Sequence, residues 1–300
     1  PQWAGSCWYF LRYADPRGTA GPAAKEAIDY WLPVDLYVGG VEHAVLHLLY
    51  SRFYTMFLHD IGVVSFDEPF TRLFNQGMIC KDGAKMSKSK GNVVNPDELV
   101  RHYGADALRM YELFIGPPEI DAEWMDGGIE GIYRFIQRVW NLTERSLQQT
   151  PAATEQGEKR LHHLIQTVTD RIESFKLNTA VSAFMEYIND VGPSVDRGSL
   201  ETLAILLSPM APHLAEELWQ KMGHGTSIFE AQWPKADPAK LVADEMTVAV
   251  QVNGKTRGTV TLNAQAAQDE VEAAALKLPA VNNAMAGKVL QKAIYVPGRI

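Results

Sequence analysis

Two cysteines are all that the 300-residue sequence contains, and it has no long apolar run. Cys7 and Cys80 stand far apart and neither belongs to a CxxC pair, which argues against a disulfide framework and a zinc ribbon. No segment reaches the roughly 18 uninterrupted apolar residues that a membrane-spanning helix needs. We therefore expect a chain of the reducing cytoplasm with no membrane partner.

The sequence also lacks an initiator methionine and a signal peptide, because it opens on Pro1-Gln2-Trp3-Ala4-Gly5-Ser6. This opening predicts an excised or internal piece of a longer protein. A hydrophobic content of 46% and a charged content of 21% are ordinary for a globular protein. The length predicts two domains, or three if one of them is small.

Positive charge is scarce, since the net charge is −8. This value argues mildly against nucleic acid as a partner. The exception is residues 245–300, where six lysines and arginines outnumber four aspartates and glutamates. Because local patches rather than the total charge decide nucleic-acid contact, this tail is a candidate for RNA binding.

One short stretch is dense in cationic and hydroxyl groups: Lys85-Met86-Ser87-Lys88-Ser89-Lys90-Gly91-Asn92, here called the lysine loop. Its three lysines can place ammonium groups on an anion, and its serines add hydroxyl donors. The turn residues at both ends, Asp82-Gly83 and Gly91-Asn92, predict a mobile loop. Such a loop suits a polyphosphate whose charge changes during a reaction. The alternative is a solvated basic loop, since charge runs usually lie on exposed faces.

Two regular elements are expected to anchor this loop. The apolar stretch 73–80, broken by Gly77, predicts a strand-like segment before it. After it, Asn95-Pro96-Asp97-Glu98 has the pattern of a helix start, with an asparagine cap, a proline at the first position and a glutamate three residues after the cap. A second helix over 107–113 should follow, with Gly104 separating the two.

A second candidate site follows Val34-Asp35-Leu36-Tyr37-Val38, which predicts a buried parallel strand ending at Gly39-Gly40. A helical pattern then begins, and α/β proteins use strand, glycines and helix to bring a ligand to a helix N-terminus. His43 and His47 are four residues apart and could form a metal pair, but no third ligand is evident. We expect no metal site there, and assign the histidines to a substrate pocket or the core.

The remaining patterns predict three further parts. Residues 3–13 are dense in aromatics and predict a buried packing segment. From 129 to about 222 the pattern is helical almost throughout, which predicts a bundle of four or five helices without a catalytic constellation. In the tail, Asn253-Gly254 predicts a hairpin, followed by a helix over 268–277 and a last strand over 288–296. Lys255 and Arg257 in this hairpin are either solvated or in contact with RNA phosphates.

The motifs together resemble a known family. Lys85-Met86-Ser87-Lys88-Ser89 is identical to the KMSKS signature of class I aminoacyl-tRNA synthetases. Residues 39–53 resemble the bacterial leucyl-tRNA synthetases rather than the valine, isoleucine or methionine enzymes, and so do Ser6-Cys7-Trp8-Tyr9 and Tyr295-Val296-Pro297-Gly298-Arg299. The resemblance covers essentially all 300 residues in the family's order.

The resemblance implies a multidomain fold. Residues 1–127 would be the second half of an α/β Rossmann-type class I catalytic domain that includes the KMSKS loop. Residues 128–236 would be an α-helical bundle of the anticodon-binding type. Residues 245–300 would be a small α+β C-terminal domain that contacts the tRNA.

The resemblance also implies the reaction: leucine and ATP give leucyl-adenylate and pyrophosphate, and the leucyl group then passes to tRNA(Leu). Lys85 and Lys88 would be catalytic, and Mg²⁺ would travel with ATP. The nucleotide would meet Lys85, Ser87, Lys88, Gly40, Glu42 and His43, with adenine against the backbone of Met78 and Ile79. The leucine pocket would hold Ser6, Tyr9 and His47, and the tRNA would meet Lys255, Arg257 and Arg299. We expect a cytoplasmic monomer.

Two features of the family do not occur in the sequence: the HxGH-type motif of class I enzymes and the editing insertion. His59-Asp60-Ile61-Gly62 lacks the second histidine. We therefore expect the C-terminal part of such an enzyme, unable to activate leucine alone. The alternative is a non-catalytic tRNA-binding paralogue or a split subunit.

Overall fold

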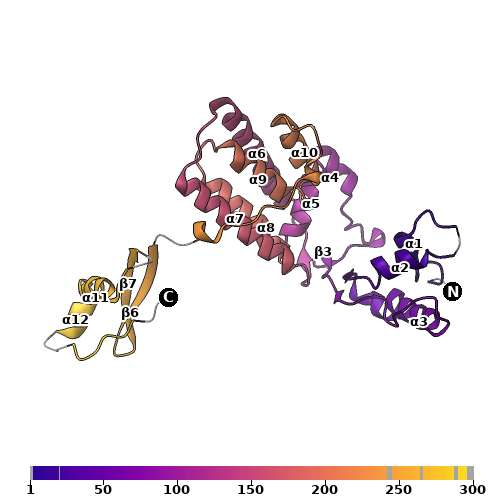
Figure 1. The fold of residues 1–300 in the computed structure, drawn as a ribbon, viewed down its shortest axis with the longest axis horizontal. Helices are drawn as coiled ribbons and strands as arrows, with labels where there is room; N and C mark the ends of the chain where they lie inside the picture. Colours follow the sequence, from indigo (N-terminus) through magenta and orange to yellow (C-terminus); the bar gives the residue numbers. More distant parts are fainter. Residues whose placement is uncertain (1–2, 20, 242–244, 264–265, 287–289, 296–300) are drawn as a thin grey trace. The chain divides into compact units, whose positions relative to one another are not determined.

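The computed structural model describes residues 3–19, 21–241, 245–263, 266–286 and 290–295 (Figure 1). They form two compact units, each considered by itself below. The first unit contains Pro1–Gly157 and Leu164–Pro234, and the second contains Glu158–His163 and Lys235–Ile300. Within the described residues, the fold is mostly helical with small sheets. No helix in these ranges is long and apolar enough to cross a membrane.

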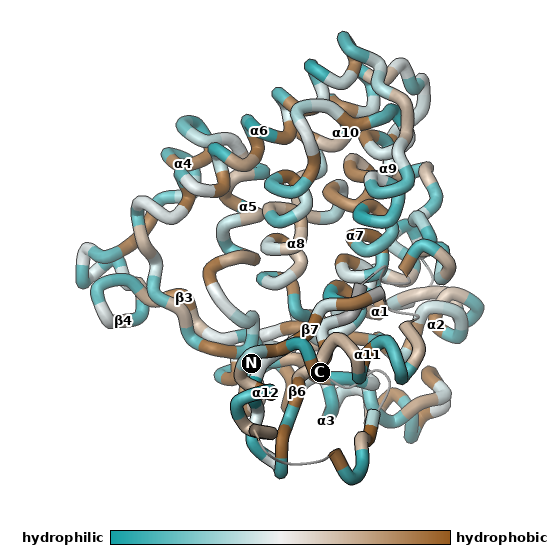
Figure 2. Tube along the Cα trace, turned by 90° about the vertical axis from the view of Figure 1, so that its left-hand side faces the viewer, coloured by the Kyte–Doolittle hydropathy of each residue, from teal (hydrophilic) through white to brown (hydrophobic). Residues whose placement is uncertain are grey.

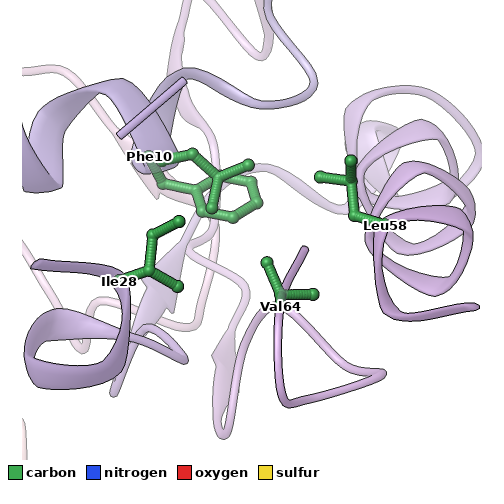
Figure 3. Packing of buried hydrophobic residues seen from close by; sticks show 5 residues of the cluster. Phe10, Ile28, Leu58 and Val64 are labelled. Carbon is green, nitrogen blue, oxygen red and sulfur yellow. The ribbon is translucent and has the colours of Figure 1, made fainter. Parts of the chain in front are cut away.

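The first unit opens with three helices around one small core. These are α1 (Tyr9–Ala14), α2 (Lys25–Trp31) and α3 (His47–Asp60). Figure 3 shows how Phe10, Ile28, Leu58 and Val64 converge from these helices and from the segment after α3. The prediction that the aromatic opening is a buried packing segment holds only in part: Cys7, Phe10 and Leu11 are at most 5% exposed, whereas Tyr9 and Tyr13 are 39% and 74% exposed.

The strand predicted at 34–38 is present but short. β1 (Tyr37–Val38) pairs in parallel with β2 (Leu73–Phe74), and an isolated parallel bridge joins Val34 to Phe70. The helical pattern after Gly39-Gly40 begins as the 3₁₀ helix η1 (Val41–Val45) and continues as α3. The order of strand, glycines and helix is therefore as predicted.

The lysine loop follows a β-hairpin. β3 (Ile79–Lys81) pairs antiparallel with β4 (Ala84–Lys85) and parallel with β5 (Ala122–Glu123). Asp82 and Gly83 connect β3 to β4. Their φ angles of 58° and 68° are left-handed, as a two-residue hairpin turn requires. Gly77 before β3 is needed because a Cβ there would lie 2.2 Å from the carbonyl carbon of Ile120.

After the loop, the helix-start pattern at Asn95 is confirmed. The Asn95 side chain accepts a hydrogen bond of 3.1 Å from the Asp97 backbone N–H and caps α4 (Pro96–Tyr103). Gly104 ends that helix, and α5 (Ala105–Phe114) follows. Both elements expected to anchor the lysine loop are therefore present.

Five further helices form the predicted bundle: α6 (Gly128–Gln149), α7 (Glu155–Glu173), α8 (Leu177–Asp190), α9 (Arg197–Leu207) and α10 (Pro212–Lys221). Figure 2 shows hydrophobic and hydrophilic residues alternating along them, as amphipathic helices require. Phe184 and Leu206 are fully buried in this core. Truncating such a phenylalanine to alanine costs about 3–5 kcal/mol.

The second unit contains the predicted hairpin. β6 (Glu245–Val252) pairs antiparallel with β7 (Lys255–Asn263), and the turn residues Asn253 and Gly254 have φ of 51° and 77°. The helix predicted at 268–277 is α11 (Gln268–Leu276), and α12 (Pro279–Met285) follows it. The short η4 (Pro238–Lys240) precedes the hairpin.

The strand predicted at 288–296 is wrong for its described part, 290–295, which is irregular. Alternating apolar residues give a segment only a propensity for strand, and a strand also needs a partner to hydrogen-bond. Leu290 is 41% exposed and Ile294 is 76% exposed, so the alternation does not bury one face. Residues 288, 289 and 296 lie outside the described part of the chain.

Candidate functional site

The lysine loop presents its cations to solvent. Lys85 ends β4, while Lys88 and Lys90 belong to the 3₁₀ helix η2 (Lys88–Lys90), and all three are exposed. Among the described residues, Lys88 and Lys90 have no ion-pair partner, and Lys85 Nζ lies 3.9 Å from Glu42 Oε1. Ammonium groups without a protein partner are available to an anion.

The same ion pair connects the loop to the turn after β1. Glu42 lies in η1, two residues after Gly40, so Lys85 and the predicted group Gly40, Glu42 and His43 are brought together. The His43 Nδ1 atom is buried and has no hydrogen-bond partner among the described residues. A buried polar atom without a partner is costly, which makes His43 a suitable contact for a bound polar molecule. The unpaired lysines and this nitrogen fit a nucleotide with phosphates.

His47 is 6% exposed and both of its ring nitrogens are engaged. Nε2 lies 2.9 Å from the Ser6 carbonyl oxygen, and Nδ1 lies 2.7 Å from the Tyr37 hydroxyl oxygen. Because a carbonyl only accepts, Nε2 carries the proton, and in the neutral ring Nδ1 accepts from the Tyr37 hydroxyl. The Tyr9 ring lies 5.5 Å from the His47 ring. The structure therefore brings together Ser6, Tyr9 and His47, the three residues predicted for a leucine pocket.

The phenols beside His47 stay protonated. Burial raises the pKa of Tyr9, and the nearby Tyr13 raises it further. Burial likewise raises the pKa of Tyr37, with Tyr9 as the smaller cause. A neutral Tyr37 hydroxyl is what allows it to donate to His47 Nδ1, and the aromatic rings of the cluster suit an apolar side chain.

The backbone of Met78 is already hydrogen-bonded. Its N–H donates to Asp121 Oδ1 at 2.7 Å, and its carbonyl accepts from the Ala122 N–H at 2.9 Å. Ile79 begins β3, the central strand of its sheet. The contact of this backbone with adenine stays a prediction.

The predicted tRNA-binding residues fall in the second unit. Lys255 and Arg257 are both exposed: Lys255 pairs with Val252 beside the turn, and Arg257 lies at the irregularity between the paired residues Thr256 and Gly258. Arg299 lies outside the described residues. The hairpin therefore carries two exposed cations near its turn, which stays compatible with both a solvated surface and an RNA contact.

The described residues contain no cluster of three or more histidine, cysteine, aspartate or glutamate side chains that could hold a metal. The rings of His43 and His47 are 6.5 Å apart and perpendicular, rather than converging on one point.

Sequence reasoning missed several residues of this site. Trp3 packs edge-on at 5.6 Å from the ring of His43, and Tyr37 fixes His47. Asp121 accepts from the Met78 N–H, and Asn92 is buried beneath the lysine loop. Tyr37 lies within an apolar strand pattern, which gives no sign of its role. Asp121 lies 43 residues from its partner Met78, so no local pattern connects the two. Asn92, a polar residue directly after a glycine turn, was the one local signal from which a structural role could have been predicted.

Comparison with known proteins gives a consistent result. Residues 8–124 match the family model "tRNA synthetases class I (I, L, M and V)", and residues 157–273 match "Anticodon-binding domain of tRNA ligase". The chain is 50% identical to the leucine–tRNA ligase of Pseudothermotoga lettingae over 98% of the chain and 38% of that protein. It is 46% identical to the leucine–tRNA ligase of Thermotoga maritima, with 98% and 39% covered.

A solved structure agrees with these relatives. The crystal structure of the agnB2 LeuRS of Agrobacterium radiobacter K84, in a ternary complex with tRNA and LeuAMS, has a TM-score of 0.83 and 36% identity. The match covers 97% of this chain and 40% of that one. The chain thus spans about two fifths of the length of the proteins that it matches.

Proposed function

We propose that the chain, which is similar to class I leucine–tRNA ligases over about two fifths of their length, supplies the lysine-loop half of an ATP site and tRNA-contacting parts to such an enzyme. The observation that carries this proposal is the exposed lysine loop with two unpaired lysines, joined through Lys85 and Glu42 to the turn that follows β1. The relatives named above are all leucine–tRNA ligases, and no observation on this chain favours the alternative of a non-catalytic paralogue.

The proposed reaction has two steps. The leucine carboxylate attacks the α-phosphorus of ATP, the bond from that phosphorus to the bridging oxygen breaks, and pyrophosphate leaves with the electron pair. A hydroxyl at the 3′ end of tRNA(Leu) then attacks the carbonyl carbon of the leucyl group and loses its proton, while the bond from that carbon to the phosphate oxygen breaks and AMP leaves with the electron pair. Neither step needs a protein nucleophile, so the protein contributes by positioning and by stabilising charge.

Lys88 and Lys85 stabilise the negative charge that grows on the departing pyrophosphate. We take Lys88 as the main contact from the family resemblance: like Lys90 it is exposed and has no ion-pair partner among the described residues, while Lys85 is already shared with Glu42. Ser87 adds a hydroxyl. Mg²⁺ accompanies the ATP, since this ion is usually bound through substrate phosphates and one or two carboxylates.

The two remaining parts of the site follow from their surroundings. Gly40, Glu42 and His43 face the ribose and the adenylate, with the unpartnered His43 Nδ1 as an available polar contact. Adenine lies against Met78 and Ile79. The leucine side chain packs on Ser6, Tyr9 and His47, where His47 offers its ring rather than its engaged nitrogens.

An exposed apolar surface on η1 and α3 supports the idea that the catalytic site is shared with the rest of the enzyme. Val45 is 72% exposed, Phe53 is 73% exposed and Leu49 is 54% exposed. Large apolar groups gathered on one exposed face usually mark a contact surface. Together with the absence of an HxGH-type motif from the sequence, this surface supports the view that the chain alone does not activate leucine.

We assign tRNA contact to the helical bundle and to Lys255, Arg257 and Arg299. The match of residues 157–273 to an anticodon-binding model supports this assignment. The same proposal includes the domain boundaries 1–127, 128–236 and 245–300, and takes the first of these domains as the second half of a Rossmann-type fold. It also includes a monomeric state and a cytoplasmic setting.

The test uses a chimera in which this chain replaces the matched region of the Pseudothermotoga lettingae enzyme. Leucine-dependent exchange of pyrophosphate into ATP is measured for the chimera and for the 300-residue chain alone. We expect exchange by the chimera and none by the chain. Exchange by the chain alone would show that it is a complete enzyme. A folded chimera that responds to another amino acid, or to none, would overturn the proposal.

A further inference from the structure

Asn92 is the buried member of the lysine loop. Its exposed fraction is 8%, whereas the three lysines of the lysine loop are exposed. A polar side chain is costly to bury unless its donors and acceptors are used. The Asn92 side chain therefore has to be matched by the loop around it.

All of its polar groups are matched. The Asn92 Nδ2 amide faces the carbonyl oxygens of Lys81, Ala84 and Lys85 at 2.9, 3.4 and 3.3 Å. Its Oδ1 accepts from the Ser87 backbone N–H at 2.9 Å. The amide cannot be turned over, because this would place Oδ1 against three carbonyl oxygens and the NH₂ group against an N–H.

These bonds connect both ends of the lysine loop. Lys81 and Ala84 belong to the β3–β4 hairpin, while Ser87 directly precedes η2, in which Lys88 lies. Gly91 has φ of 69°, and this left-handed turn brings Asn92 back beneath the loop. The side chain thus closes the stretch 81–92 into one unit that fixes Lys85 relative to Lys88.

We propose that Asn92 is a positioning residue, which clamps the lysine loop so that Lys85 and Lys88 meet the same polyphosphate. It does not touch ATP, since it is buried beneath the loop. The clamp stands on the geometry alone, and its effect on the reaction rests on the function proposed above. When Lys85 and Lys88 are already held in place, they can stabilise the negative charge that develops on the pyrophosphate without first having to be ordered.

The clamp itself is tested on the 300-residue chain with Asn92→Ala and Asn92→Asp. The aspartate keeps the size but places a negative oxygen against three carbonyls. Trypsin cleavage after the loop lysines should accelerate about tenfold or more in both variants, since cleavage needs local opening, and alanine removes all the side-chain hydrogen bonds of Asn92 whereas aspartate removes those of Nδ2. In Asn92→Ala, the Ser87 amide proton should also lose its protection from exchange. Asn95→Ala is the matched control: it removes a helix cap only three residues away and should leave the loop as resistant as before.

The effect on the reaction is tested in the chimera. Asn92→Ala should raise the KM for ATP and lower kcat, about tenfold in kcat/KM, while the KM for leucine is unchanged. A variant that only loosened the whole fold would change both substrates together. Unchanged loop cleavage would overturn the clamp, and a looser loop with unchanged ATP kinetics would overturn its role in positioning. If the unsubstituted chimera shows no exchange, the proposed function fails, and the cleavage experiment still decides the clamp.

Discussion

The carboxylate of Asp106 on α5 accepts a hydrogen bond of 2.6 Å from the backbone N–H of Leu214, 108 residues later in the chain. Leu214 lies in the first turn of α10, whose preceding residue Ala211 has no side chain that can cap a helix. The second oxygen of Asp106 accepts from His213 Nδ1 at 2.8 Å. Asp106 on α5 therefore caps the N-terminus of the bundle helix α10. A negative charge at a helix N-terminus is also favoured by the helix dipole.

Replacing Asp106 by alanine should destabilise the first unit. The side chain is 8% exposed, so its loss leaves the Leu214 N–H buried without a partner. We expect the free energy of unfolding to fall by about 1.5–3 kcal/mol, the range for hydrogen bonds to charged groups. Urea denaturation followed by circular dichroism measures it. Asp67→Ala, at an exposed aspartate, should change the value by less than about 0.5 kcal/mol.

The hydroxyl of Tyr37 should matter for both stability and leucine binding. Tyr37→Phe keeps the ring stacked on Phe70 at 4.1 Å but removes the donor to His47 Nδ1. That buried nitrogen then keeps only the 3.4 Å contact with the Ser51 hydroxyl, and the loss of the shorter hydrogen bond should cost about 0.5–1.5 kcal/mol of unfolding free energy. In the chimera, the KM for leucine should rise more than the KM for ATP. Tyr13→Phe is the control, because Tyr13 is 74% exposed. Equal behaviour of the two variants would contradict the assigned role of Tyr37.

The connection between α10 and η3 (Ile228–Glu230) should depend on pH. The Ile228 N–H donates to the Glu216 carboxylate at 3.0 Å, as does the Ser227 hydroxyl. These hydrogen bonds, that of Ile228 first, hold the pKa of Glu216 below its usual range. A lowered folded-state pKa contributes stability above the pKa of the unfolded chain, about 4.3, and this stability is lost as the pH falls further.

The corresponding measurement compares the chain with its Glu216→Gln variant between pH 7 and pH 3. The variant should be less stable at pH 7, and the difference should shrink as the pH falls below about 4. A difference that stays constant down to pH 3 would show that the charge of Glu216 is unimportant.

The hairpin cations should contribute to tRNA affinity through their charge. Each of Lys255→Ala and Arg257→Ala should weaken binding of tRNA(Leu) to the chain and reduce the slope of log affinity against log salt by about one. Fluorescence anisotropy over a salt series measures both quantities. Lys277→Ala, after α11 in the same unit, is the matched control and should leave the slope unchanged. Unaltered slopes in all three variants would favour the solvated surface.

Local signals in the sequence predicted the local structure well. The helix cap and the two turns are present at the expected residues: the cap at Asn95-Pro96 and the turns at Asn253-Gly254 and Asp82-Gly83. In each of them, the residues that cause the cap or turn lie within two to four positions of one another. The last strand was predicted from alternation alone, and its described residues 290–295 are irregular. Strand pairing depends on a partner that the segment's own residues do not specify.

The contacts that organise the site were not accessible from local patterns. Asp106 and Leu214 are 108 residues apart, and Met78 and Asp121 are 43 apart, so the partner of each carboxylate follows only from the packed fold. The bonds of His47 to Tyr37 and Ser6 likewise needed the structure. The roles of the site residues came from the family resemblance and stay predictions.

The most direct test of the account is leucine-dependent pyrophosphate exchange by the chimera with Lys88→Ala, compared with Lys90→Ala in the same loop. Both variants remove one exposed lysine charge, so their effects on folding and on the long-range field should match. The account predicts a loss of roughly 100- to 1,000-fold for Lys88→Ala, as for other groups that stabilise a developing negative charge, and less than about tenfold for Lys90→Ala. Equal losses in the two variants, or none, would contradict it.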